Sequence, residues 1–450
     1  MKTYLLPVLL VLVFAAYSLP LFLRVYSTTQ MVIDEEFHLR QGIRYCQKQF
    51  KEWDPKITTF PGLYFFALLL IPLEFCEVLG LRLISLVAAA VNVVLLYYIR
   101  RKSLGNAHST LAALEALTIG SLPPLYFFSH LYYSDTLSLT MVLLMYAFWQ
   151  KGSHLQASVY AAASVLMRQT NVVWVAMAFG TTALDLVTVK YAELKGIKPN
   201  DVKIYQPKVI FDILKRFELV MKCLWYIITQ GCFYLIIILP FMGFVYLNGS
   251  IVLGDKRAHE ASIHLPQLFY FSIFCCFFGI SNIINRFRAT MQAIWQYKSE
   301  MIMLTIVFLM IVRFNTLVHP YLLADNRHYI FYIWQRLYGR YWWFKYCMCP
   351  VYSIALMFVH QGIKHLRFNL QFMFWLATAI VLCFQRLLEL RYFIIPFVLF
   401  RLNTRPNLKS SRAHWIELSF NVLLNAITFY IFFTKEIKWD NYKEPQRLIW

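Results

Sequence analysis

Residues 24–64 read RVYSTTQMVIDEEFHLRQGIRYCQKQFKEWDPKITTFPGLY, a polar stretch that directly follows the apolar segment 5–23. Three consecutive carboxylates, Asp34, Glu35 and Glu36, lie in its middle. Nearly everything after it is apolar, and charged groups beside a membrane bundle are costly unless they serve a function. We therefore expect the rest of the chain to be a membrane bundle arranged around this loop.

The composition of the whole chain indicates a membrane protein. Of its 450 residues, 60% are hydrophobic and 15% are charged, whereas soluble proteins are about 45–50% apolar and about 25% charged. We predict an all-α polytopic membrane protein that forms one integral membrane domain over residues 1–450, with about 11 to 14 transmembrane helices of roughly 20 residues. The predicted spans are 5–23, 82–99, 109–128, 136–150, 155–167, 172–188, 224–247, 267–285 and 301–318, followed by runs at 328–345, 346–361, 369–385, 392–400 and 416–433.

The formal net charge of +20 would suggest a nucleic-acid partner in a soluble protein. No aromatic and basic nucleic-acid module is visible in this sequence. In a membrane protein, Lys and Arg gather at the cytoplasmic ends of the spans, and some of them meet anionic lipid or phosphate. The charge therefore predicts a lipid bilayer, and no nucleic acid, as the partner.

The same charge rule assigns sides to the loops. With a cytoplasmic N-terminus, residues 24–79 lie on the far side, because a crossing at 62–79 would place the basic run 100–102 outside. The apolar run 62–79 is expected to lie in the outer membrane face or to re-enter it. Residues 189–222 contain eight Lys or Arg against four Asp or Glu, so they are predicted to form a large cytoplasmic loop.

The acidic cluster and the neighbouring His38 allow two interpretations. Asp34 can cap a helix whose first turn carries acids, because the apolar residues that follow it fit an amphipathic helix. Alternatively, these carboxylates accept a proton or contact a substrate. The two interpretations are compatible, since the first residue of a surface helix can present its carboxylate at the membrane face.

The end of the loop, KEWDPKITTFPGLY at 51–64, combines aromatic and turn-forming residues. Pro and Gly set turns. Trp53 and Tyr64 offer rings that can stack on a sugar, and Asp54 offers a carboxylate beside them. An interfacial aromatic belt is the alternative interpretation.

Cationic residues recur on the same predicted side of the membrane. A lipid phosphate needs cationic donors near the membrane surface, and the forked guanidinium of arginine suits it well. Any one of these residues can instead be an interfacial charge that snorkels to the surface, so their repeated placement is what favours a phosphate site. They are Arg168 in RQTN, Lys256, Arg257, His259 and His264 in GDKRAHEASIH, Arg327 and His328 in DNRHY, and Arg391 in ELRYF.

The remaining patterns concern cysteines and known motifs. Cys46 and Cys76 flank the first loop and could form a disulfide if that side is oxidising. No Cys/His metal spacing is present, and neither are the GxGxxG, HExxH or GxSxG patterns. The single N-glycosylation sequon, at Asn248, falls on the predicted outer side but very near the membrane.

Taken together, the motifs resemble the endoplasmic-reticulum α-1,2-glucosyltransferase family of asparagine-linked glycosylation, which adds the last glucose to the lipid-linked oligosaccharide. DEEFH followed by KEWDPKITTFPGLY is similar to the first-loop signature of that family. MRQTNVVW, GDKRAHEASIHLPQLFY, HPYLLADNRHY and LLELRYFIIPF resemble its later motifs and fall in the family's order. The first loop departs at Glu36, where an apolar residue is expected, and this leaves open which acid has which role.

The resemblance implies the multi-span GT-C glycosyltransferase fold, a location in the endoplasmic reticulum membrane and an active site on the lumenal face. Residues 24–79 would then be a lumenal catalytic loop with juxtamembrane helices. The implied donor is dolichyl phosphate glucose. The implied acceptor is the dolichyl-diphosphate oligosaccharide that already bears two glucoses, and the α-1,2 linkage would form with inversion of the β-linked donor.

Such a displacement needs a base for the acceptor hydroxyl, and a carboxylate is the natural choice. We assign this role to Asp34, with Glu35 orienting the acceptor. No cofactor and no essential metal is expected, although the acids at 34–36 could bind one. Further candidate substrate contacts are Glu36, His38, Trp53, Asp54, Tyr64, His259 and Arg391.

The leaving group of the reaction is a lipid phosphate, which is already stable as an anion. Cationic donors that stabilise its growing charge are therefore needed more than a strong acid. Arg327 and His328 are the first choices for this role, followed by Arg168 and Lys256.

The competing hypothesis is a transporter of polyprenyl lipid or solute, or a channel-associated membrane subunit. Intramembrane charge and broken spans also suit a substrate pathway. In this chain the acids and bases gather in loops on one face rather than at the middle of the membrane. This placement favours the enzyme.

Overall fold

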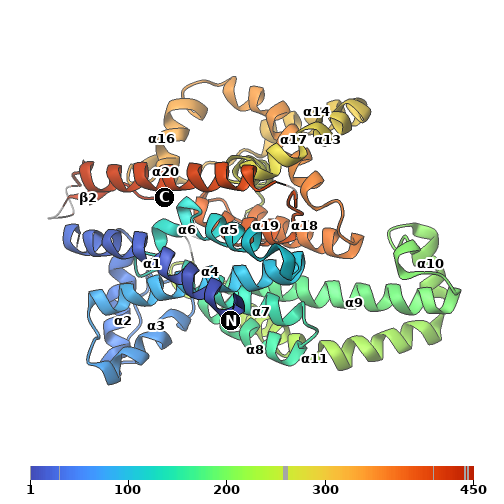
Figure 1. Cartoon of the computed structure of the whole chain (residues 1–450), viewed down its shortest axis with the longest axis horizontal. Helices are drawn as coiled ribbons and strands as arrows, with labels where there is room; N and C mark the ends of the chain where they lie inside the picture. The colour runs from blue at the N-terminus through green and yellow to red at the C-terminus, as the bar shows by residue number, and fades with distance from the viewer. Residues whose placement is uncertain (1, 30, 257–261, 409, 440–441, 443–444) are drawn as a thin grey trace.

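The structure, a computed structural model, describes residues 2–29, 31–256, 262–408, 410–439, 442 and 445–450, and these are predominantly helical (Figure 1). The first half contains α1 (Lys2–Thr28), α2 (Glu35–Cys46), α3 (Gly62–Ala67), η1 (Leu68–Leu73), α4 (Val78–Leu104), η2 (Asn106–His108), α5 (Ser109–Gly120), α6 (Pro123–Phe128), α7 (Ser134–Trp149), α8 (His154–Met167), η3 (Gln169–Asn171), α9 (Val172–Lys195), η4 (Pro199–Asp201), α10 (Pro207–Lys215) and α11 (Phe217–Asn248). The second half contains α12 (Pro266–Phe278), α13 (Ile280–Gln296), α14 (Lys298–Asn315), α15 (Pro320–Ala324), α16 (Tyr329–Ile333), the π-helix η5 (Trp334–Tyr338), α17 (Phe344–Ile363), α18 (Phe368–Cys383), η6 (Leu390–Phe393), α19 (Ile394–Asn403), α20 (Arg412–Thr434), and the short strands β1 (Glu436–Ile437) and β2 (Gln446–Arg447).

The long helices follow the long axis of the molecule, which is horizontal in Figure 1. α2 and α3 lie at the left end of this view, and α10 lies at the right end. The acidic first loop and the basic 189–222 segment are therefore at opposite ends of the bundle.

Six described helices are long and apolar enough to cross a membrane, and the bent pair α12–α13 is a seventh if it counts as one span. The predicted all-α, multi-pass fold is thus confirmed. The number of continuous spans is lower than the predicted 11 to 14, because several predicted spans are short helices packed within the bundle. Examples are α5 with 12 residues, α7 with 16 and α8 with 14.

Two predicted spans are broken by residues that interrupt a helix. The span at 109–128 divides into α5 and α6, since Pro123 and Pro124 begin a new helix. The span at 267–285 divides at Gly279, where α12 and α13 meet at 103°. A Cβ atom on Gly279 would lie 2.4 Å from the carbonyl oxygen of Cys275, so the bend leaves no room for a side chain.

The basic segment 189–222, which the sequence predicted to be a loop, is largely helical. α9 continues to Lys195, and α11 begins at Phe217. Between them α10 packs Val209 and Ile213 against the buried Tyr191 and Leu219.

The first loop is tied to the bundle by apolar packing, and a disulfide links two parts of the loop to each other. Residues Leu39 and Tyr64 share a buried cluster with Leu81 at the start of α4 and with Tyr132. Apolar residues of 62–79 form α3 and η1, a 12-residue apolar pair that is too short to be counted as a span.

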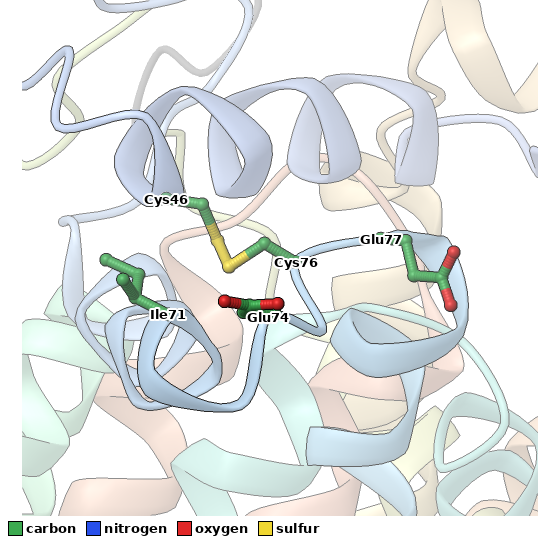
Figure 2. Close-up of a pocket in the computed structure, with 5 residues that line it drawn as sticks. All are labelled: Cys46, Ile71, Glu74, Cys76 and Glu77. Atoms are coloured by element: carbon green, nitrogen blue, oxygen red, sulfur yellow. A yellow bond between two sulfur atoms is a disulfide. The ribbon is translucent and has the colours of Figure 1, made fainter.

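Cys46 and Cys76 are bonded to each other, with their Cα atoms 6.2 Å apart, so the disulfide that the sequence allowed is present. Figure 2 shows this disulfide beside an open cavity of about 300 Å³, which Ile71, Glu74 and Glu77 also line. No residue predicted for the catalytic or phosphate site lines this cavity.

Candidate active site

Asp34 stands at the turn between the first helix and α2. Ile33, the residue before it, has a φ of +49°, a left-handed conformation that is unusual for a β-branched side chain. Such local strain tends to occur in functional segments. Asp34 occupies the N-cap position of α2, but its side chain makes no capping hydrogen bond. Its carboxylate is therefore available for another contact.

The Asp34 side chain is 49% exposed, and its Oδ2 lies 3.5 Å from Nη2 of Arg391. Arg391 comes from η6, 357 residues away in the sequence. An exposed carboxylate beside a fixed guanidinium can accept a proton from a bound hydroxyl group. Asp34, which the sequence predicted as the base, and Arg391, which it predicted as a substrate contact, are thus brought together.

Glu35, by contrast, has no exposed side-chain surface. Its two carboxylate oxygens accept hydrogen bonds from Nε and Nη2 of Arg82, at 2.8 and 2.7 Å. One of them also accepts a bond of 2.7 Å from the backbone N–H of Tyr132. The structure therefore places Glu35 inside the protein, where it anchors α2 to α4, and not where it could orient an acceptor.

Arg391 is held by Glu389, its ion-pair partner two residues earlier. Burial alone would raise the pKa of Glu389, but the positive charge and hydrogen bond of Arg391 outweigh burial and lower this pKa to about 2. The same pair keeps the pKa of Arg391 well above its ordinary value despite burial. The guanidinium lies 5.9 and 5.8 Å from the ring centres of Tyr133 and Tyr392, so its position is fixed on three sides.

Arg168 joins the same group through Tyr392, whose ring centre is 5.5 Å from its guanidinium carbon. It is extended, between α8 and η3, and pairs with Asp135 in the first turn of α7. Asp135 is 4% exposed, and its Oδ2 has no hydrogen-bond partner among the described residues. The predicted cations Arg168 and Arg391 therefore both lie beside the ring of Tyr392.

His38 faces the same region from α2. Its Nδ1 lies 2.7 Å from the hydroxyl of Tyr64, and its ring centre lies 5.5 Å from that of Tyr133. Burial lowers the pKa of His38 to about 4, although the charge of Asp34 partly opposes this. His38 is therefore neutral at neutral pH.

The aromatic end of the first loop is turned into the protein. Tyr64 is fully buried, and the Trp53 ring meets it edge-on at 5.7 Å. Asp54 accepts a hydrogen bond of 2.9 Å from the N–H of Lys56 and so closes a turn. Tyr64 thus supports His38 and cannot stack on a sugar in this arrangement.

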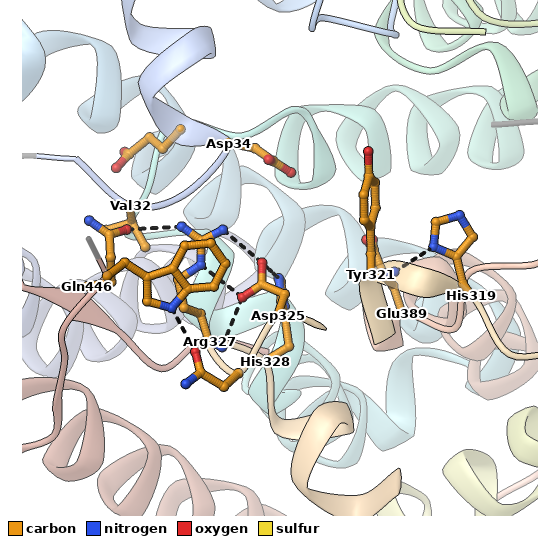
Figure 3. Close-up of polar contacts among 12 residues, drawn as sticks. Val32, Asp34, His319, Tyr321, Asp325, Arg327, His328, Glu389 and Gln446 are labelled. Carbon is orange, nitrogen blue, oxygen red and sulfur yellow. Dashed lines mark hydrogen bonds and ion pairs between the residues drawn. The ribbon is translucent and has the colours of Figure 1, made fainter. Parts of the chain in front are cut away.

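Arg327 is also occupied within the protein (Figure 3). Its side chain donates to both oxygens of Asp325, at 2.9 and 2.8 Å, and to Oε1 of Gln446 at 3.3 Å. Its guanidinium carbon lies 4.1 Å from the ring centre of Trp439. Arg327 is 7% exposed, whereas the side chain of His328 is 26% exposed and lies 3.7 Å from Asp325.

The other predicted site residues are distributed around this region. Lys256 donates a hydrogen bond of 2.6 Å to the carbonyl oxygen of Asn248 and is exposed. Glu36 forms an ion pair with Arg40 one turn along α2. Arg257 and His259 lie outside the described residues.

Sequence reasoning missed three residues that complete the group: Glu389, Asp135 and Tyr133. The signal for Glu389 was present, because it stands two residues before Arg391 in the ELRYF motif. Asp135 and Tyr133 had no comparable signal, since they lie in YYSDT after an apolar run and their partners are distant in the chain.

Metal sites were also considered. Among the described residues, no group of three or more His, Cys, Asp or Glu side chains is placed to hold a metal ion. That no metal is essential remains a prediction.

Comparisons with known proteins identify relatives of this chain. The sequence profile of the DIE2/ALG10 family matches residues 28–402. A Drosophila melanogaster protein named Dol-P-Glc:Glc(2)Man(9)GlcNAc(2)-PP-Dol alpha-1,2-glucosyltransferase is 54% identical over 438 residues, which cover 97% of each chain. A Homo sapiens protein of the same name is 33% identical, and the alignment spans 93% of each chain. An Arabidopsis thaliana protein of that name is 31% identical, and the alignment spans 93% of this chain and 94% of the relative. No solved structure matches it.

Proposed function

The chain belongs to the DIE2/ALG10 family, and from this premise we propose that Asp34, Arg391 and Arg168 form the active site of its glycosyl transfer. The enzyme is a Dol-P-Glc-dependent α-1,2-glucosyltransferase. It transfers glucose from dolichyl phosphate glucose to Glc2Man9GlcNAc2-PP-dolichol and adds the terminal glucose in N-glycan precursor assembly.

Asp34 is the general base in this proposal. The single observation that carries it is the contrast between the Asp34 carboxylate, 49% exposed and 3.5 Å from Arg391, and its buried neighbour Glu35. As the acceptor oxygen attacks the anomeric carbon, Asp34 takes the hydroxyl proton. The bond from that carbon to the phosphate oxygen breaks on the opposite face, which inverts the configuration.

Arg391 and Arg168 receive the lipid phosphate that leaves. Each guanidinium is held by the carboxylate of Glu389 or Asp135, whose side chains are 16% and 3% exposed, so its orientation does not have to change during the reaction. Donors preorganised in this way stabilise the developing negative charge. His328 is the third donor in this proposal. Arg327 contributes indirectly, because its guanidinium already donates to Asp325 and Gln446.

Asp135 positions Arg168 in this proposal. It is 4% exposed and pairs with the Arg168 guanidinium, so it acts on the phosphate site through Arg168.

The active site faces the lumen of the endoplasmic reticulum in this proposal. A disulfide between Cys46 and Cys76 suits an oxidising compartment. The basic segment around α10 lies at the opposite end of the molecule (Figure 1), and basic segments favour the cytoplasmic side. Single cysteines placed near residue 70 and near residue 200 should react with membrane-impermeant reagents from opposite sides of sealed microsomes, and labelling from the same side would contradict this orientation.

The decisive test is reconstitution. The purified protein is supplied with dolichyl phosphate [³H]glucose and with acceptors that bear one, two or three glucoses. We expect label to enter only the two-glucose acceptor and to be released by an α-1,2-specific glucosidase. Label in the one-glucose acceptor, or donor movement across the bilayer without transfer, would overturn the assignment.

A further inference from the structure

The end of the described chain, residues 436–439 and 445–450, folds back along the loop that carries Arg327 and His328. We call these residues the strap. β1 pairs with β2 in antiparallel register, and Ile449 then forms a parallel bridge with His328. The N–H of Ile449 donates to the carbonyl of Arg327 at 2.8 Å, and the N–H of Tyr329 donates to the carbonyl of Ile449 at 3.2 Å.

Side chains of the strap also contact the loop that carries Arg327 and His328. The side-chain oxygen of Gln446 accepts a hydrogen bond from Arg327. The ring of Trp439 covers the guanidinium of Arg327. The Trp439 indole N–H donates to Asn326 at 2.8 Å. Trp450 lies 4.8 Å from the ring of Tyr329 and 6.1 Å from the ring of Phe278, beside the α12–α13 bend. Four consecutive residues, 326–329, are thus held from one side.

The loop held by the strap is continuous with the candidate active site. Ile330 and Trp334 pack in one apolar cluster with Leu388 and Leu390, and these two leucines flank Glu389. His328 is near enough to Glu389 to be among the groups that lower the pKa of that carboxyl. The 326–330 loop therefore sets the position of His328 relative to Glu389 and its partner Arg391.

We propose that the strap is a positioning element of the active site, which holds the Asn326–Tyr329 backbone and Arg327 so that His328 faces the leaving phosphate. The inference rests on the proposed function and extends it to residues far from Asp34. In this view Arg327 acts through His328 rather than on the phosphate itself. A displacement of about 1 Å at a reacting group can slow turnover about 10²-fold, so a strap without any substrate contact can still affect the reaction.

The test uses one backbone position. I449P removes the N–H that donates to Arg327 and cannot complete the bridge, whereas I449A keeps that N–H and loses only side-chain packing. We expect I449P to lower kcat by roughly 10- to 100-fold with the KM for the two-glucose acceptor unchanged. I449A should lose thermal stability and keep its kcat.

A double-mutant cycle separates positioning from general damage. In a His328→Ala background, I449P should lower kcat no further, because the group that it displaces is already absent. Full additivity of the two changes, or equal effects of I449P and I449A, would overturn the proposal. If I449P does not fold, Q446L takes its place, because it removes the contact with Arg327 and leaves the backbone bridge intact.

Binding of dolichyl phosphate to the protein in nanodiscs gives a readout that does not depend on transfer. We expect I449P and His328→Ala to weaken this binding to the same extent, and the double variant to be no weaker. An inactive wild type with this binding pattern would contradict the proposed function and leave the strap inference standing. Unchanged binding and turnover in I449P would contradict the strap alone.

Discussion

The candidate active site and the opposite end of the bundle both pair arginines with carboxylates, but they differ in what the carboxylates can reach. Arg100, near the end of α4, pairs with Glu115, and Arg401, near the end of α19, pairs with Glu417. All four side chains are 0–1% exposed. At the active site, the carboxylate of Asp34 is half exposed.

The buried pairs form hydrogen bonds with backbone groups where helices end or bend. Arg100 donates to the carbonyls of Leu402 and Thr404 at the end of α19, at 2.8 and 3.1 Å. Glu417 accepts a bond of 2.7 Å from the N–H of Ser281, just after the break at Gly279. Helix ends leave such groups without partners. These pairs are therefore structural, and exposure of one carboxylate distinguishes the candidate active site from them.

The largest effect is expected where the exposed carboxylate is neutralised. Asp34→Asn preserves size and N-cap preference, but the amide cannot take a proton, so kcat should fall by about 10²–10⁴. Glucose transfer to the two-glucose acceptor measures this, with thermal unfolding measured in the same detergent. A stable variant with near-normal turnover would show that another group is the base. Exposure of the carboxylate would then not separate catalytic pairs from structural ones.

Sequence reasoning located the first loop, its helix and most of the long helices, because these depend on local patterns. Asp34 and the Arg168 and Arg391 motifs could be found in the same way. The role of Glu35 could not, since its partner Arg82 lies 47 residues away and burial of an acid depends on tertiary packing. Arg327 looked like a free phosphate ligand, although its partner Asp325 stands two residues earlier in the same motif. Its other partners, Trp439 and Gln446, are more than 100 residues away in the sequence and gave no local signal.

A smaller effect, on stability rather than chemistry, is expected at the opposite end. Glu417→Gln leaves Arg401 buried without a charged partner, which should lower the free energy of unfolding by about 3–5 kcal/mol. Turnover per folded molecule should be retained. The matched control is Glu193→Gln, which removes an exposed pair with Lys190 and should change stability by less than about 1 kcal/mol. Equal losses in the two variants would mean that burial does not separate the two kinds of pair.

The smallest effect concerns the pH dependence that His38 imparts to stability. Its pKa is about 4 in the folded protein because burial disfavours the charged ring, whereas an unfolded histidine has a pKa of about 6.5. Above pH 6.5 both states are neutral and His38 has no effect. As the pH falls from 6.5 towards 4, only the unfolded state gains a proton at this position, so the folded state loses stability. His38→Asn cannot be protonated in this range, and its unfolding midpoint should therefore decline less steeply between pH 7 and pH 4 than that of the wild type.

Both proteins share all other titrating groups, so the difference between the two curves isolates His38. Parallel curves would show that His38 titrates alike in both states, and would remove the neutral histidine from the description of the site.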